Sequence, residues 1–131
     1  MLPGGSDKKG PALIRKLDGV AVMAIGTLDD GPWRIVVSPD PWTQHKNLQR
    51  GNSAPLVAGA MLWFRNEKSA RDVAARAGAT FARIQQEQRM PLAWFVMAAG
   101  DVQRILEKSA QLERAEFWSA QAWAAQAEAK R

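Results

Sequence analysis

The sequence predicts an α+β domain, in which helices flank a small, mainly antiparallel three-stranded sheet and a long C-terminal helix closes the chain. Three observations predict this class. Three short apolar runs, at residues 20–26, 33–38 and 56–64, are flanked by turn-forming residues, which is typical of β-strands. Helix caps or helical apolar periods mark three further segments, near 41–50, 66–88 and 101–128. The length of 131 residues suits one hydrophobic core.

The first two strands are expected to form a hairpin. Val20–Gly26 is almost wholly apolar, which fits a buried strand, and the turn formers Asp29-Asp30-Gly31-Pro32 follow it closely. Trp33–Ser38 is the second strand. A linker this short makes antiparallel pairing the natural arrangement.

Asp40 and Pro41 mark the start of the first helix. The Asp40 carboxylate can accept from free backbone N–H groups of the first turn, and proline fits the first helical position because no N–H is needed there. Gly51 stands at a plausible C-cap position. A helix near 41–50 follows, and Pro55 then precedes the third strand.

The segment 66–88 has a clear helical period. Pro91 ends it, and residues 92–97 form either a short fourth strand or an extended edge. The apolar face of the helix 66–88 is expected to consist of Ala70, Val73, Ala74, Ala77, Phe81 and Ile84.

The last helix, predicted over 101–128, has two apolar stripes. The first is expected to pack on the sheet. The second stripe contains Trp118. It indicates either contact with another protein chain, including a second copy, or packing back over the sheet. The interface candidates are Trp118, Ala115, Ala122 and Ala125.

We expect residues 1–11 to be a flexible lead-in, residues 12–97 the domain, and residues 98–131 the C-terminal helical part. The chain has no cysteine and a single histidine, His45, so we expect no metal and no cofactor. No apolar run reaches the roughly 20 residues of a membrane span, and the first residues lack an apolar signal region. A cytoplasmic protein without membrane contact is therefore expected.

The net charge of +5 is concentrated in the middle of the chain. Residues 34–89 hold nine basic and four acidic side chains, whereas basic and acidic residues balance on either side. A local excess of this kind suits a polyanion such as DNA or RNA. We expect Arg65, Lys68, Arg76 and Arg83 to make the contact, with Lys46 and Arg50 nearby, and Arg34 is a further candidate. Trp33 and Trp42 lie near these cations, and they either stack nucleobases or form a hydrophobic cluster.

Two motifs carry a family resemblance. The first is Arg34-Ile-Val-Val-Ser-Pro-Asp-Pro41, and the second is Leu48-Gln-Arg-Gly-Asn-Ser-Ala-Pro-Leu56. Together with the order strand–strand–helix–strand–helix, they resemble the phage and bacterial branch of the GIY-YIG nuclease superfamily. That branch carries Lys-Ile-Gly-x-Ser-x-Asp-Pro and Leu-Gln-x-Gly-Asn-x-x-Pro-Leu. The resemblance covers about residues 19–97.

The resemblance implies catalysis by a strand tyrosine, a helix arginine and a metal-binding glutamate. This chain has no tyrosine, and the matching positions carry Met23, Arg34, Val36, Gln44 and Ala74. Without the carboxylate, no oxygen ligand remains for a divalent cation. Gln44 cannot neutralise a phosphate as arginine does. The resemblance therefore implies a pseudoenzyme.

Three functions remain open. The first is an inactive GIY-YIG-like protein that binds nucleic acid through its basic surface. The second is a phage-derived or bacterial protein-interaction or inhibitor module that uses the C-terminal Trp-Ala helix. The third is an active metal-dependent nuclease with relocated catalytic residues, against which the three missing groups weigh.

Overall fold

Three antiparallel strands form the centre of the molecule, in a computed structural model that describes residues 19–27, 30–91 and 94–129. The strands are β1 (Val20–Gly26), β2 (Trp33–Ser38) and β3 (Val57–Phe64), and their spatial order is β2-β1-β3. All seven residues of the central strand β1 are buried. The predicted sheet is confirmed, with the third strand beginning one residue later than predicted.

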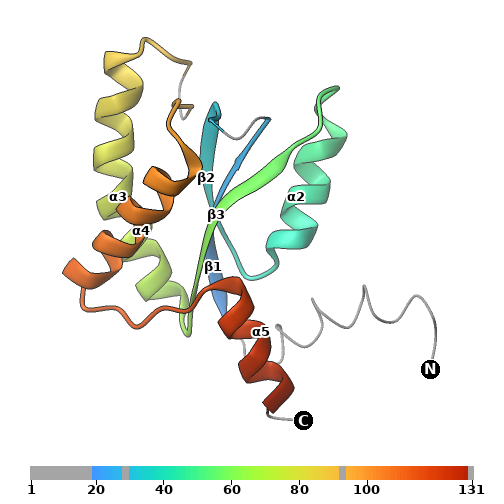
Figure 1. The fold of residues 1–131 in the computed structure, drawn as a ribbon, viewed down its shortest axis with the longest axis vertical. Helices are drawn as coiled ribbons and strands as arrows, with labels where there is room; N and C mark the ends of the chain where they lie inside the picture. The colour runs from blue at the N-terminus through green and yellow to red at the C-terminus, as the bar shows by residue number, and fades with distance from the viewer. Residues whose placement is uncertain (1–18, 28–29, 92–93, 130–131) are drawn as a thin grey trace.

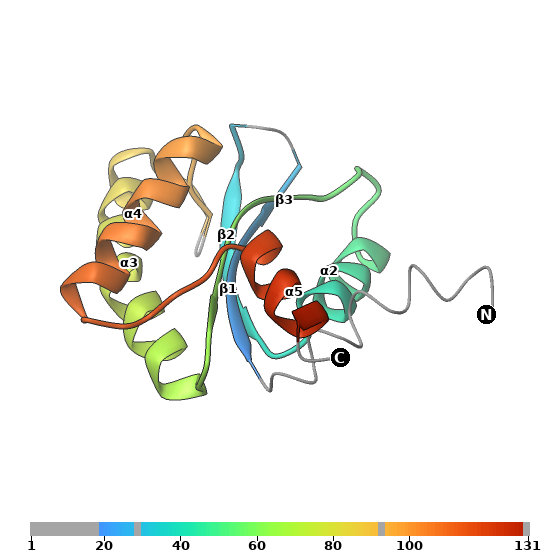
Figure 2. The same ribbon diagram turned by 60° about the horizontal axis from the view of Figure 1, so that its bottom comes forward.

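Helices cover both faces of this sheet. The described helices are α2 (Pro41–Arg50), α3 (Glu67–Glu87), α4 (Ala99–Leu112) and α5 (Ala120–Ala129). Figure 1 shows their order along the chain, and Figure 2 shows α3 and α4 on one side of the sheet with α2 and α5 on the other. The predicted α+β class is confirmed. No described helix has the length and apolar character that crossing a membrane requires.

Side-chain caps start the two helices that were predicted most sharply. The Asp40 carboxylate accepts from the Thr43 backbone N–H at 3.2 Å and from the Thr43 hydroxyl at 2.8 Å. At the start of α3, the Asn66 side chain accepts from the Ser69 N–H at 2.8 Å. Both caps satisfy a backbone donor that the first helical turn leaves without a partner.

Alternation along β1 divides the interior into two sides. Val20, Val22 and Ala24 pack with α3 and α4 in the main core, whereas Met23 and Ile25 lie on the opposite side. This is the two-residue period of a strand. The predicted apolar face of α3 is confirmed, since its members are either buried in the main core or packed against it: Ala70, Val73, Ala74, Ala77, Phe81 and Ile84.

Trp33 is the most tightly enclosed side chain of the edge strand β2. It is fully buried, and its indole N–H donates to the Met97 carbonyl at 2.6 Å. Backbone hydrogen bonds in both directions join Trp33 to Phe95, at 2.6 and 3.1 Å. Among the described residues of the segment 92–97, the extended edge is therefore an isolated bridge and not a fourth strand; residues 92–93 lie outside the described part.

The prediction of one continuous helix over 101–128 is wrong. The chain leaves the helical path between α4 and α5, and Arg114 adopts a left-handed φ of 54°. The Ala115 N–H then donates to the Ala110 carbonyl at 2.9 Å, the long hydrogen bond of a Schellman helix end. Because arginine occupies the left-handed position instead of glycine, the sequence carried no stop signal. The predicted lead-in, residues 1–11, lies outside the described residues.

Candidate functional site

The positions that the sequence resemblance assigned to catalysis lie in two different layers. Met23 is 1% exposed on the α2 side of the sheet, where it pairs in register with Val36. Gln44 is half-buried on α2. Ala74, in contrast, packs against the main core on the α3 side. The structure therefore brings Met23 and Val36 together but separates both from Ala74.

The surroundings of Met23 are apolar. Its cluster contains Ile25 and Leu56, with Val36 and Leu48 packed against it. A hydrated cation would lose its water ligands there without gaining oxygen ligands. Among the residues that the structure describes, no group of three or more His, Asp or Glu side chains could hold a metal ion.

His45 has a structural partner. Its Nε2 atom lies 2.8 Å from the Leu56 carbonyl oxygen, and because a carbonyl can only accept, Nε2 is the donor. The Gln49 side-chain oxygen accepts from the Leu56 N–H at 2.7 Å. These two α2 side chains thus hold the backbone just before β3, and they fix α2 against the sheet.

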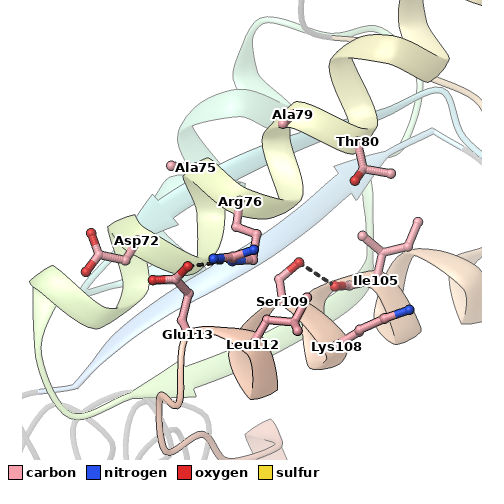
Figure 3. Close-up of a pocket in the computed structure, with 10 residues that line it drawn as sticks. All are labelled: Asp72, Ala75, Arg76, Ala79, Thr80, Ile105, Lys108, Ser109, Leu112 and Glu113. Carbon is pink, nitrogen blue, oxygen red and sulfur yellow. Dashed lines mark hydrogen bonds and ion pairs between the residues drawn. The ribbon is translucent and has the colours of Figure 1, made fainter.

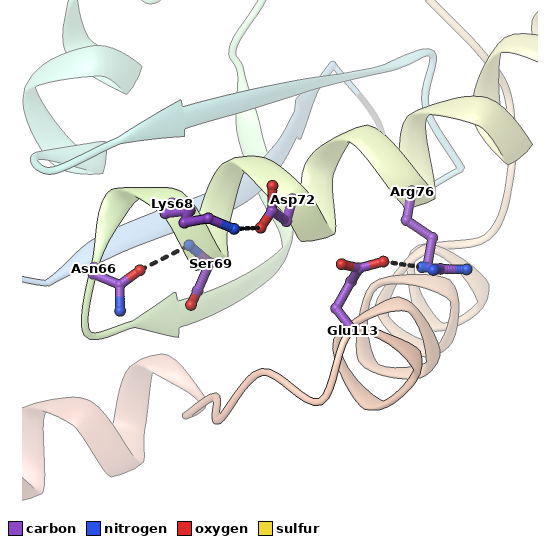
Figure 4. Close-up of polar contacts among 6 residues, drawn as sticks. All are labelled: Asn66, Lys68, Ser69, Asp72, Arg76 and Glu113. Carbon is purple, nitrogen blue, oxygen red and sulfur yellow. Dashed lines mark hydrogen bonds and ion pairs between the residues drawn. The ribbon is translucent and has the colours of Figure 1, made fainter.

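Three of the basic candidates on and before α3, Arg65, Lys68 and Arg76, have acidic neighbours. The Lys68 amine lies 2.7 Å from the Asp72 carboxylate, and this hydrogen bond raises the pKa of Lys68 (Figure 4). Arg76 reaches across to α4, where its Nε lies 2.5 Å from the Glu113 carboxylate. Arg65 lies 4.0 Å from Glu116 and stacks over the Trp118 ring, 4.7 Å from its centroid.

The basic residues of β2 and α2 have no such neighbours. Arg34, Lys46 and Arg50 are exposed, and none of them forms an ion pair with a described residue. The sequence from 41 to 66 contains no Asp or Glu. Figure 1 shows α2 leaving the end of β2 and running back alongside the sheet. We call Arg34, Lys46 and Arg50 the α2–β2 basic surface. Of the candidates on α3, Arg83 is likewise exposed and without an ion pair to a described residue.

An open groove of about 780 Å³ runs between α3 and α4 (Figure 3). The Arg76–Glu113 ion pair spans it, and the Ser109 hydroxyl donates to the Ile105 carbonyl at 2.7 Å. Leu112, 58% exposed, lies at the groove as well. Arg76, Glu113 and Ser109 thus have partners inside the protein, while Thr80 and Lys108 also line the groove beside the apolar side chains Ile105 and Leu112.

The predicted interface stripe does not form. Trp118 and Ala115 lie between α4 and α5, outside any helix, so they share no helical face with Ala122 and Ala125. The Trp118 backbone pairs with Trp63 at the edge of β3, with hydrogen bonds of 2.7 and 2.9 Å. Ala115 packs against the main core, while Ala122 and Ala125 are exposed on α5. Of the two readings of Trp118, the structure shows packing back over the sheet.

Four tryptophans from separate parts of the chain meet on the α2 side. Trp42 of α2 stacks on Trp63 of β3 with 5.8 Å between ring centroids. Trp63 stacks in turn on Trp123 of α5 at 5.7 Å, and the Trp118 ring meets Trp123 edge-on at 5.0 Å. The indole N–H groups of Trp63 and Trp123 are buried without a hydrogen-bond partner among the described residues. No sequence spacing joins these four positions, so the cluster could not be predicted.

Comparison with known proteins found no match for this chain among protein-family models, curated proteins or solved structures.

Proposed function

We propose that this chain is a catalytically inactive, GIY-YIG-like binding domain that contacts DNA or RNA through the α2–β2 basic surface. The observation that carries the proposal is the state of Arg34, Lys46 and Arg50. All three are exposed and have no ion pair to a described residue, and Asp40 is the single acidic residue of the sequence from 31 to 66. Cations of this kind can neutralise phosphates and release counterions, which is the main source of nonspecific affinity for nucleic acid.

The cations around α3 are weaker candidates. A phosphate that approached Lys68 or Arg76 would compete with Asp72 or Glu113, and the carboxylate would remain nearby as a repulsive charge. The pairing of these side chains therefore favours the α2–β2 basic surface as the centre of the contact. Arg83, which has no ion pair to a described residue, remains available for a phosphate contact on α3.

Lack of catalysis is supported by the side chains at the motif positions. Met23 and Ala74 offer neither acid, base nor metal ligand, and they lie in different layers of the fold. Membership of the superfamily rests on the two sequence motifs and on the order of the elements.

The test compares two triple variants in a salt titration on duplex DNA. Arg34→Ala/Lys46→Ala/Arg50→Ala removes the α2–β2 basic surface, and Lys68→Ala/Arg71→Ala/Arg76→Ala removes the same charge from α3. We expect the first variant to bind much more weakly and to flatten the log–log salt slope by about 0.9 for each lost phosphate contact. The second should retain most of the affinity. Equal losses in both variants, or no binding at low salt, would contradict the proposal.

A protein-interaction module is the second candidate, and one chain can combine it with nucleic-acid binding. The exposed Leu112 at the α3–α4 groove favours it. Purification of the native protein with its partners, followed by nuclease digestion, separates the two functions. A partner that survives digestion is protein, and a partner that digestion removes was held through nucleic acid.

A further inference from the structure

Three exposed side chains line one stripe of α2. Trp42, Lys46 and Arg50 are spaced four residues apart, so they lie one above another on the same side of the helix. The stripe is about 12 Å long, because eight residues of helix rise 1.5 Å each. Thr43 and Asn47 flank it and are exposed too. The stripe thus combines one aromatic ring with two cations and polar neighbours.

Trp42 is held in place from behind. It is 37% exposed, and it stacks on the fully buried Trp63 with an angle of 26° between the rings. Trp63 in turn stacks nearly parallel on Trp123, at 3°. A side chain fixed in this way has already lost most of its rotamer freedom, so a ligand that stacks on it meets a smaller entropic cost.

We propose that the α2–β2 basic surface takes single-stranded nucleic acid, with an unpaired base stacked on Trp42 and phosphates on Lys46 and Arg50. This inference rests on the proposed function and deepens it. In the interior of a duplex, the neighbouring base pairs cover both faces of each base, so stacking along the length of α2 requires unpaired bases. Aromatic platforms next to cations are the general means by which proteins hold single strands.

The charge of the stripe identifies this occupant. A protein partner for an exposed tryptophan gains from apolar neighbours, whereas Trp42 is followed along its stripe only by cations. No Asp or Glu occurs from 41 to 66, and the Asp40 carboxylate at the N-cap of α2 accepts from the Thr43 N–H and hydroxyl. A strand that runs along α2 would therefore meet the ring and both charges in succession.

The experiment measures binding of the full chain to a 12-nucleotide oligothymidine and to a 12-base-pair duplex, at one salt concentration. Trp42→Leu keeps an apolar cover on Trp63 but has no aromatic face, and Trp42→Phe keeps a smaller one. We expect the unaltered protein to prefer the single strand. Trp42→Leu should weaken single-strand binding roughly 5- to 150-fold, the range for the loss of one stacked base, and Trp42→Phe should weaken it less. Duplex affinity should change by less than about 2-fold, because no base stacks there.

Fluorescence gives a second readout that does not depend on Trp42→Leu folding. A base stacked on Trp42 quenches its emission, so oligothymidine should quench the unaltered protein more strongly than Trp42→Phe. Equal quenching in the two proteins, or equal weakening of duplex and single-strand binding by Trp42→Leu, would overturn the stacking proposal while leaving the proposed function intact. Failure to bind either nucleic acid at low salt would overturn both.

Discussion

Trp33 shows how single residues decide whether this sheet can form. Its ring crosses from the edge strand β2 over the central strand to β3, because glycines occupy the positions beneath it. A Cβ atom at Gly59 would lie 2.2 Å from the ring, and one at Gly26 would lie 2.7 Å from it. Gly59 is also the unpaired residue of a β-bulge, since Ala24 pairs with Ala60 while Ile25 pairs with Ala58. Two glycines thus make room for one buried tryptophan.

The first prediction concerns Gly59. Gly59→Ala should lower the free energy of unfolding by about 1–3 kcal/mol, because the new methyl group overlaps a ring that is buried on all sides. Gly78→Ala is the matched control. Gly78 lies within α3, and apart from its chain neighbours and the surrounding helix backbone no atom lies within 4 Å of the added Cβ, so this change should raise the free energy of unfolding by about 0.5–1 kcal/mol. Chemical denaturation measures both. If Gly59→Ala left the free energy of unfolding unchanged, Trp33 would be able to move aside, and the prediction would be wrong.

Among the elements, the ends of α3 and α4 follow the same pattern. Arg89 and Arg114 adopt positive φ angles of 55° and 54°, and the following residues, Met90 and Ala115, donate to carbonyls five positions earlier. Both helices therefore end in a left-handed turn without glycine. The strain of such a residue is small enough for the contacts beyond it to offset. Beyond Arg114, these contacts are those of Trp118 with the sheet.

The second prediction tests the segment between α4 and α5. Trp118→Ala should lower the free energy of unfolding by about 2 kcal/mol, below the range for a fully buried tryptophan, because Trp118 is only half-buried. Its lost contacts are with Trp123 and Arg65. The oligomeric state should not change, and Ala125→Gln on the exposed side of α5 should leave stability nearly unaltered. Loss of an assembly at unchanged monomer stability would instead identify Trp118 as an interface residue.

At the scale of the whole molecule, the sheet separates two kinds of surface. The α3–α4 layer carries ion pairs within and between its helices, including Lys68–Asp72, Arg71–Glu67 and Arg76–Glu113. The α2 layer carries cations without such partners. Exposed ion pairs contribute little to stability, but they reduce the positive field of their own layer. The unpaired positive charge of these two layers therefore lies mainly on the α2 side.

The third prediction concerns chemistry. We expect no cleavage of single-stranded or duplex DNA in the presence of Mg²⁺ or Mn²⁺, because Met23, Gln44 and Ala74 supply neither a metal ligand nor a general base. A nicking assay on supercoiled plasmid measures this sensitively. Cleavage that follows the protein through a final column and disappears in a point variant would contradict the prediction, and it would favour a nuclease with relocated catalytic residues.

The sequence by itself determined the elements whose signals are local. The apolar run of β1, the Asp40-Pro41 start of α2 and the apolar period of α3 all act within a few residues, so their bounds were predicted to within about one residue. The concentration of basic residues in the middle of the chain was equally evident from the sequence. The end of α4 could not be predicted, because arginine at the left-handed position gives no sequence signal of the kind that glycine gives.

Only the tertiary structure decided which residues meet. Arg76 and Glu113 are 37 positions apart, and their pairing depends on how α4 packs against α3. The same holds for the tryptophan stack, which joins α2, β3 and α5, and for the separation of Met23 from Ala74 by the sheet. The sequence alone placed Arg65, Lys68, Arg76 and Arg83 ahead of the other basic candidates. Packing distinguishes the seven candidates, because the fold places a carboxylate beside some of these cations and leaves others facing water.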